Sequence, residues 1–311
     1  MRMRALVLGA LVLGALVVIS PAAAPRVAAA QGRPSTDVWM VTLQGPGVPR
    51  VGRAENLTAR TGYDNQPSFT ADGRALLYTV IEGDAPSEIY RLDLETRVRT
   101  NLTRTAVESE YSATPMPDGV HFSSVRVEAD SAQRLWRFAL RGDEAPALLI
   151  AGIQPVGYHV WVGDAMLGLY VLGSALGTPN SPPATLQLAD VRSGTAEVRA
   201  RDIGRALQKI PGRAAISYVQ QGADGAWITA LDVRTGVSSP IAKAPERADY
   251  HVWTPDGVLL AGSGSRILVW SHGTWQVAAD LAADGVRGIS RLAVSPNGDR
   301  LTFVAEDRAT P

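Results

Sequence analysis

The stretch Phe69-Thr70-Ala71-Asp72-Gly73 decides the fold of this 311-residue chain, because variants of it return at a nearly constant interval. Asp72 is followed by aspartates at 118 and 164, each 46 residues after the one before, and by Asp256 at twice that interval. The further copies are Met116-Pro117-Asp118-Gly119, Val162-Gly163-Asp164, Thr254-Pro255-Asp256-Gly257 and Ser295-Pro296-Asn297-Gly298. A fixed period in this range predicts a repeat architecture.

The repeat has six copies once a degenerate one is included. A copy is expected near residue 210, and the turn Ile210-Pro211-Gly212 occupies that place without an aspartate. The last interval, from Asp256 to Asn297, is shorter, at 41 residues, and we attribute this to the lack of insertions in that unit.

Each unit has the pattern of four strands. In the first unit the run Glu88–Leu94 alternates between apolar and polar residues, which is typical of a strand. The other three strands of this unit are expected at Pro67–Thr70, Ala75–Val80 and Val98–Leu102. Four strands per unit around a ring is the plan of a β-propeller. The sequence therefore predicts an all-β fold, a six-bladed β-propeller of four-stranded blades.

Two local features carry separate expectations. The pair Asp72-Gly73 stands between apolar runs, which favours a tight hairpin turn with positive φ at both central residues. The segment Val198–Gln208 has some helical spacing, and we interpret it as the irregular start of the fourth blade.

The two ends of the chain are expected to share the last blade. The C-terminal part supplies two strands, Leu292–Ser295 and Arg300–Ala305, and the other two are expected at Asp37–Leu43 and Arg53–Leu57. Such a closure pairs the ends of the ring and removes exposed strand edges.

The first thirty residues have the features of a secretory signal peptide. A short basic start is followed by an uncharged run from Ala5 to Ile19 and by Ala28-Ala29-Ala30, a small-residue cleavage site. The run falls short of the roughly 20 residues that a membrane span needs. We therefore expect a signal peptide at residues 1–30, one propeller domain at 31–311, and export through the Sec pathway. The sequence leaves open whether the protein is periplasmic or secreted to the medium.

Composition argues against several partners and cofactors. Without residues 1–30 the chain has 27 basic and 30 acidic residues, so it has no electrostatic footprint for nucleic acid. The chain has no cysteine, which removes thiolate nucleophiles and disulfides. We expect a monomer without a cofactor and without a membrane span after the signal peptide is cleaved.

The chain resembles the TolB-like propeller repeat family, which is related to WD40-like repeats. The resemblance is carried by Asn56-Leu57-Thr58 and then by Asp64-Asn65-Gln66-Pro67-Ser68-Phe69-Thr70-Ala71-Asp72-Gly73. It extends over most of residues 36–306 and implies a six-bladed propeller. Such propellers include protein-binding platforms and enzyme domains. The additional N-terminal α/β domain of TolB has no counterpart here, so the resemblance does not imply the TolB role in the Tol-Pal system.

Alignment of the turns predicts which residues begin the inner strands at one mouth of the central channel. Tyr158-His159 and Tyr250-His251 occupy matching places in the third and fifth blades, while Arg205 and Arg291 occupy the first of these two places in the fourth and sixth. These six residues are the candidate ligand-binding residues: Tyr158, His159, Arg205, Tyr250, His251 and Arg291.

The two histidines have two interpretations. They could face a common cavity as ligand or metal donors, or each could pack between blades. Zinc needs at least three protein ligands. The third corner of the ring, in the first blade, offers Pro67 in place of a histidine, so we expect no metal site.

The function expected from the whole chain is that of an exported, non-catalytic binding module for a protein or a small polar ligand at the channel mouth. A structural component of an envelope assembly is a further possibility. The alternative is a lyase or hydrolase that uses the rim histidines with nearby acids, such as Asp64, Glu108, Glu110, Glu246 and Asp249. The Gly-x-Ser-x-Gly pentapeptide of α/β-hydrolases does not occur.

Overall fold

A computed structural model describes residues 35–174, 180–246 and 248–306. Within these residues the fold is all-β, with strands β1 to β25 and one short 3-10 helix, Ala282–Asp284. The described residues lie in one compact unit. The predicted signal peptide lies outside the described residues. No helix in the described part of the chain is long and apolar enough to cross a membrane.

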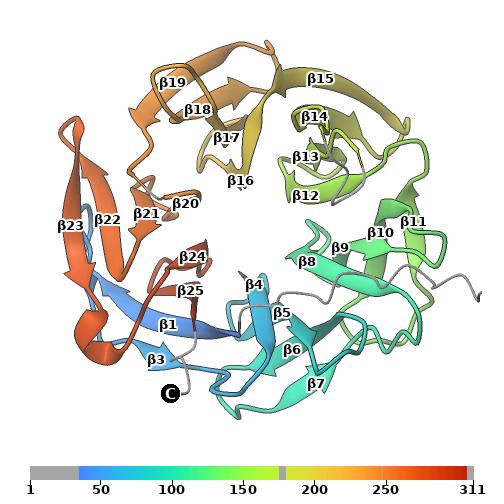
Figure 1. Ribbon diagram of the computed structural model, residues 1–311, viewed down its shortest axis with the longest axis horizontal. Helices are drawn as coiled ribbons and strands as arrows, with labels where there is room; N and C mark the ends of the chain where they lie inside the picture. The colour runs from blue at the N-terminus through green and yellow to red at the C-terminus, as the bar shows by residue number, and fades with distance from the viewer. Residues whose placement is uncertain (1–34, 175–179, 247, 307–311) are drawn as a thin grey trace, which may run out of the picture. The chain divides into compact units, whose positions relative to one another are not determined.

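The strands form six antiparallel blades around a central axis (Figure 1). Blade 1 consists of β4 (Tyr63–Phe69), β5 (Ala75–Ile81), β6 (Glu88–Asp93) and β7 (Arg99–Asn101). Blade 2 consists of β8 (Ser109–Pro115), β9 (His121–Val127), β10 (Gln133–Ala139) and β11 (Ala147–Ile150). Blade 3 consists of β12 (Val156–Trp161), β13 (Met166–Val171), β14 (Thr185–Asp190) and β15 (Thr195–Arg201).

The remaining blades follow the same order from the axis outward. Blade 4 consists of β16 (Ile203–Lys209), β17 (Ala215–Gln220), β18 (Trp227–Asp232) and β19 (Ser238–Lys243). Blade 5 consists of β20 (His251–Trp253), β21 (Leu259–Ser263), β22 (Arg266–Ser271) and β23 (Thr274–Asp280). The inner strands β4, β8, β12, β16 and β20, together with β24 of blade 6, surround the axis (Figure 1).

Blade 6 is built from both ends of the described chain. Its strands are β24 (Ser290–Val294), β25 (Arg300–Glu306), β1 (Thr36–Gln44) and β3 (Glu55–Asn56), and β2 (Arg50–Val51) also pairs with β1. Seven residue pairs from Thr36↔Glu306 to Thr42↔Arg300 join β1 to β25. The fold class, including the closure by shared terminal strands, is confirmed.

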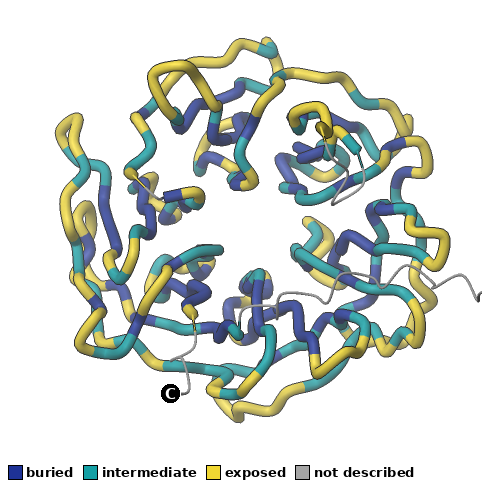
Figure 2. Tube along the Cα trace, in the orientation of Figure 1, coloured by how far each residue is buried: buried dark blue, intermediate teal, exposed yellow. Residues whose placement is uncertain are grey.

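The hydrophobic core lies between neighbouring blades as well as within them. One cluster joins Val125 and Leu135 of blade 2 to Leu167 and Leu169 of blade 3. The second strand of each blade is mostly buried, while the outer strands are more exposed (Figure 2). Each blade therefore depends on its two neighbours for burial of its apolar faces.

The recurring turn differs from the expected two-residue hairpin. Only Gly73 has positive φ, at 68°, and its N–H donates to the Thr70 carbonyl over 2.8 Å. Asp72 acts as a local cap instead, since its carboxylate accepts hydrogen bonds from the Thr70 hydroxyl and the Arg74 N–H. These bonds lower the pKa of Asp72. The expectation of positive φ at both residues was wrong because four residues, 71–74, connect the strands, and longer hairpin loops are built around a type I turn.

The segment Val198–Gln208 contains no helix. Its first residues end β15, the outer strand of blade 3, and its last residues lie in β16, the inner strand of blade 4. Asp202 connects the two strands with a φ of 56°. The apparent helical spacing arises because both strands carry a register shift, which interrupts the two-residue alternation.

Candidate functional site

The six inner strands surround a cavity of about 190 Å³ on the axis. Every one of the six strand positions predicted from the repeat contributes to it. All six candidate residues line this cavity: Tyr158, His159, Arg205, Tyr250, His251 and Arg291. The polar residues Gln66, Ser68, Ser112, Thr114 and Gln208 complete much of its wall.

Backbone bulges bring three of the lining side chains into place. Gln66, Ser112 and Arg291 occupy equivalent positions in blades 1, 2 and 6, and their φ angles are 56°, 56° and 53°. The register of each inner strand shifts at this residue. A left-handed backbone at a residue other than glycine costs about 1–3 kcal/mol, and such strain tends to occur at ligand clamps and active sites. Sequence reasoning missed this feature because nothing in the residue types at these positions signals it.

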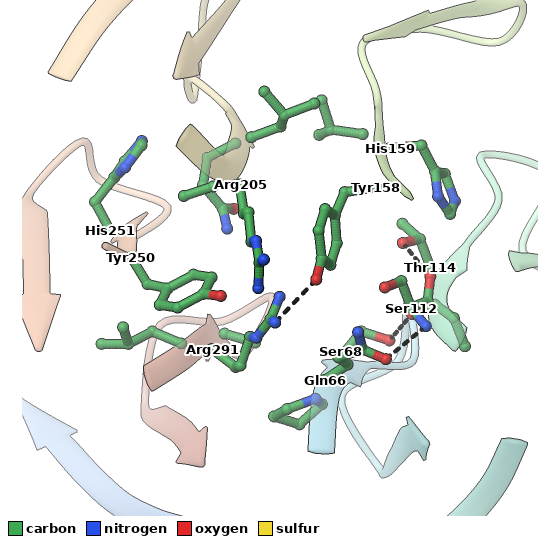
Figure 3. Close-up of a pocket in the computed structure, with 18 residues that line it drawn as sticks. Gln66, Ser68, Ser112, Thr114, Tyr158, His159, Arg205, Tyr250, His251 and Arg291 are labelled. Carbon is green, nitrogen blue, oxygen red and sulfur yellow. Dashed lines mark hydrogen bonds between the residues drawn. The ribbon is translucent and has the colours of Figure 1, made fainter. Parts of the chain in front are cut away.

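Two arginines and two tyrosines converge inside the cavity from four different blades (Figure 3). Arg291 donates a hydrogen bond of 2.9 Å to the Tyr158 hydroxyl. Its guanidinium lies 4.8 Å from the ring centroid of Tyr158 and 4.5 Å from that of Tyr250. These cation–π contacts hold Arg291 between two aromatic rings.

No acidic side chain neutralises these cations. Within the described residues, neither Arg205 nor Arg291 has a carboxylate within 4.0 Å, and no aspartate or glutamate lines the cavity. Attraction to the hydroxyls of Tyr158, Tyr250 and Tyr170 raises the pKa of Arg205. Burial raises the pKa of Tyr250 to about 12. The site therefore combines two guanidinium groups with tyrosine hydroxyls.

A hydroxyl opposite the cations has no hydrogen-bond partner. The Ser112 Oγ is buried and unpartnered among the described residues. The neighbouring Gln66 is held by the Thr79 hydroxyl, which donates to its Oε1 over 2.8 Å, and by the Ser112 N–H at 3.0 Å. A ligand in the cavity could thus meet the fixed Gln66 amide as well as the guanidiniums.

The two histidines belong to a second kind of structure, a buried network between blades. His159 of blade 3 is 7 % exposed, and its Nε2 lies 2.6 Å from the Ser123 Oγ of blade 2. The Trp161 indole N–H donates to the same oxygen over 2.9 Å. The Ser123 hydroxyl is 3.3 Å from the Thr114 carbonyl, to which it donates. We therefore assign the proton of His159 to Nε2, because Ser123 then accepts two hydrogen bonds and donates one.

The same network recurs between blades 4 and 5. His251 is 1 % exposed, with its Nε2 2.8 Å from the Ser217 Oγ, and the Trp253 indole donates to that oxygen over 2.8 Å. The Nδ1 atoms of both histidines are buried and have no hydrogen-bond partner among the described residues. Burial lowers the pKa of each imidazole to about 3. Both rings are therefore neutral at ordinary pH.

The network left a signal in the sequence that could have been found. The residue four or five positions after the turn glycine is serine only in the blades that precede a histidine, as at Ser123 and Ser217. In the other blades this position holds Leu77, Gly168, Ala261 or Thr302. The pairing of serine with the histidine of the next blade indicates packing between blades, which was one of the two interpretations of these histidines.

None of the five rim acids is among the described residues that line the cavity with the histidines. Asp64 is fully buried and lies 2.5 Å from the Arg60 guanidinium, while Glu110 lies 2.8 Å from Arg126. Desolvation raises the pKa of both carboxyls in spite of these partners. In the described part of the chain no three His, Cys, Asp or Glu side chains form a group that could hold a metal ion.

These features define the class of protein, a six-bladed β-propeller with a cationic channel. Solved structures resemble it in fold. A TolB-like protein of Agrobacterium tumefaciens matches with a TM-score of 0.66 and 13 % identity, over 89 % of this chain and 100 % of that one. A gluconolactonase of Xanthomonas campestris matches with a TM-score of 0.61 and 12 % identity, over 89 % and 99 %. An oligogalacturonate lyase of Vibrio parahaemolyticus matches with a TM-score of 0.53 and 15 % identity, over 89 % and 99 %.

The fold is that of the TolB-like β-propellers, as the sequence resemblance implied. No family model matches the chain, and no curated protein matches it in sequence. At these identities the similar structures establish the fold alone. They include both TolB proteins and enzymes, so they do not distinguish a binding module from a catalyst.

Proposed function

We propose that this protein is an exported, non-catalytic binding module that takes an anionic ligand into its central channel. One observation carries the proposal: the guanidiniums of Arg205 and Arg291 line a cavity to which the described part of the chain contributes no acidic side chain. Arginine stays charged in proteins and presents several N–H donors in a fixed fork, which suits carboxylate or phosphate groups. An anion between these two side chains would supply the missing countercharge.

The cavity also supplies hydrogen-bond donors that would orient such a ligand. Arg291 already uses one N–H for Tyr158 and is held between two rings, so little side-chain freedom would be lost on binding. A protein could use the same site by inserting an acidic side chain or its terminal carboxylate.

The enzyme alternative loses the general base on which it depended. The imidazoles of His159 and His251 are bonded to serines and buried, and their pKa values near 3 make them very weak bases. A catalytic base works best with a pKa near the operating pH. No other observation in the described residues favours a particular reaction.

Isothermal titration with sulfate and with acetate tests the anion site. Arg291→Gln should weaken binding about 10- to 100-fold, as expected for loss of a charge-assisted hydrogen bond. The affinity of Arg291→Lys should lie between those of wild type and Arg291→Gln, because lysine keeps the positive charge but lacks the forked set of N–H donors. Arg213→Gln is the matched control, since Arg213 is exposed on the turn between β16 and β17 and does not line the cavity. Equal affinities in all four proteins would refute the proposal.

Export is tested separately. N-terminal sequencing of the protein purified from a bacterial envelope or medium should begin at Gln31, as the Ala28-Ala29-Ala30 site predicts. Recovery of a chain that begins at Met1 from the cytosol would contradict it.

A further inference from the structure

A second cavity, of about 500 Å³, adjoins the first. The two cavities share four lining residues: Gln66, Tyr158, Arg205 and Arg291. The arginines thus stand where the cavities meet, and an anion bound to them could extend a substituent into the larger space. The volume lies within the range of small-molecule sites, about 300–1,000 Å³.

The larger cavity lies mainly between blades 2 and 3, and its wall is largely apolar. Val125 and Val127 of β9 and Leu172, which follows β13, supply aliphatic surface. Tyr63, Tyr111 and Tyr170 supply rings in addition to Tyr158. Apart from the two shared arginines, no charged side chain of the described residues lines this cavity.

A glycine allows the aromatic wall to pack closely. A Cβ atom at Gly157 would lie 2.9 Å from the Cδ1 of Tyr170, so any side chain here would displace that ring. The ring of Tyr170 lies edge-on to that of Tyr158, with centroids 5.5 Å apart and an angle of 67° between the planes. Tyr158 in turn contacts Arg291, so the aromatic wall of the large cavity continues to the two arginines of the proposed anion site.

We propose that the ligand is a small organic acid with an apolar body, whose carboxylate binds Arg205 and Arg291 while its aliphatic or aromatic part fills the larger cavity. This proposal rests on the anion site proposed above and adds the chemistry of the rest of the ligand. An inorganic anion or a short hydrophilic acid would leave the aliphatic and aromatic wall in contact with water. An apolar body removes that surface from water, which is the main source of affinity in such sites.

A homologous series of acids tests this inference. Acetate, butyrate and hexanoate are titrated into the intact protein, with hexanamide as the uncharged comparison. Each buried methylene should increase affinity about fourfold, so hexanoate should bind roughly two orders of magnitude more tightly than acetate. Hexanamide should bind far more weakly than hexanoate, because it lacks the charge that the arginines attract.

Substitutions that keep volume and add polarity test the location. Val127→Thr and Leu172→Asn should each lower hexanoate affinity about three- to tenfold, since each places a polar group against the apolar chain. Both should leave acetate affinity within twofold of wild type. Val277→Thr is the matched control, because Val277 is 55 % exposed on the outer strand β23.

The outcomes separate the two proposals. Affinity that rises with chain length and falls in Val127→Thr and Leu172→Asn supports the inference. Carboxylates that bind equally at all chain lengths, with binding lost in Arg291→Gln, would overturn the inference and leave the anion site standing. Absence of binding for every anion would overturn both. Octanoyl peptides with a free C-terminal carboxylate are compared with the same peptides as C-terminal amides, to show whether a peptide terminus can replace the small acid. Binding of hexanoate or of the peptide carboxylate supports recognition of a carboxylate joined to an apolar chain.

Discussion

Acidification from pH 7.5 to pH 5 should destabilise this propeller through its two buried histidines. His159 and His251 are buried, and burial lowers their pKa values from 6.5 to about 3. In the unfolded chain they protonate near pH 6.5, while in the folded protein they stay neutral. A depressed folded pKa therefore contributes stability above pH 6.5, and this stability is lost progressively as the pH falls toward 3.

The magnitude follows from the two pKa values. A pH of 5 is about 1.5 units below the histidine pKa in the unfolded chain, and each pH unit corresponds to about 1.36 kcal/mol. Each histidine should thus account for a loss of about 2 kcal/mol between pH 7.5 and pH 5, and the pair for about 4 kcal/mol. Asp64 and Glu110 have raised pKa values and act in the opposite direction, but they are common to all variants compared.

Urea denaturation at both pH values measures the effect. His159→Gln keeps a donor for Ser123 but cannot titrate, so its loss of stability between the two pH values should be about 2 kcal/mol smaller than that of wild type. His272→Gln is the control, because His272 is exposed on the turn between β22 and β23 and should show the wild-type pH dependence. The reasoning is refuted if His159→Gln and wild type lose the same free energy of unfolding on acidification.

Three further predictions concern stability. Ser123→Ala leaves the His159 and Trp161 donors buried without an acceptor, so the free energy of unfolding at pH 7.5, measured by urea denaturation, should fall by about 2–4 kcal/mol. Ser193→Ala is the exposed control and should change this free energy by less than about 0.5 kcal/mol. A similarly small effect of Ser123→Ala would contradict the network. Phe303→Ala in the closing strand β25 should cost about 3–5 kcal/mol, and deletion of residues 36–58 should yield an aggregating chain in size-exclusion chromatography, because β25 would lose its partner β1; a monomeric, folded deletion variant would contradict the closure. The ring nitrogens of His121 face the carboxylates of Asp118 and Glu144, which accept hydrogen bonds from the protonated ring and raise its pKa. His121→Gln should therefore reduce the melting temperature at pH 6 more than at pH 8, where the stabilisation from a raised folded pKa has been lost. Equal reductions at both pH values would argue against an ionic role.

Much of the architecture could be predicted because its signals are local. The turns recur at a fixed interval, and the strands between them alternate or run apolar, so six blades and their closure followed from spacing alone. The predicted turn geometry at Asp72-Gly73 was wrong because loop length depends on where the hydrogen-bonded pairing of the two strands stops, which the dipeptide does not show. The segment Val198–Gln208 misled because a register shift breaks the alternation on which strand prediction depends.

The repeat predicted which residues stand at one level of the channel but not how their side chains are oriented. The repeat placed Tyr158, His159, Arg205, Tyr250, His251 and Arg291 at one level of the channel, and all six line the cavity. The repeat did not show that the tyrosines and arginines converge in the cavity, nor that the imidazoles form hydrogen bonds with serines of the preceding blade.

Repeat length and strand period can be read directly from the amino acids, so they predict the number of blades, the closure of the ring and the residues on the inner strands. Which of two adjacent side chains points to the channel depends on the folded backbone. Neighbouring side chains on a strand point to opposite faces, and a single bulged residue exchanges those faces. At Gln66, Ser112 and Arg291 the left-handed backbone makes that choice, and it is stabilised by contacts across blades that lie far apart in the chain.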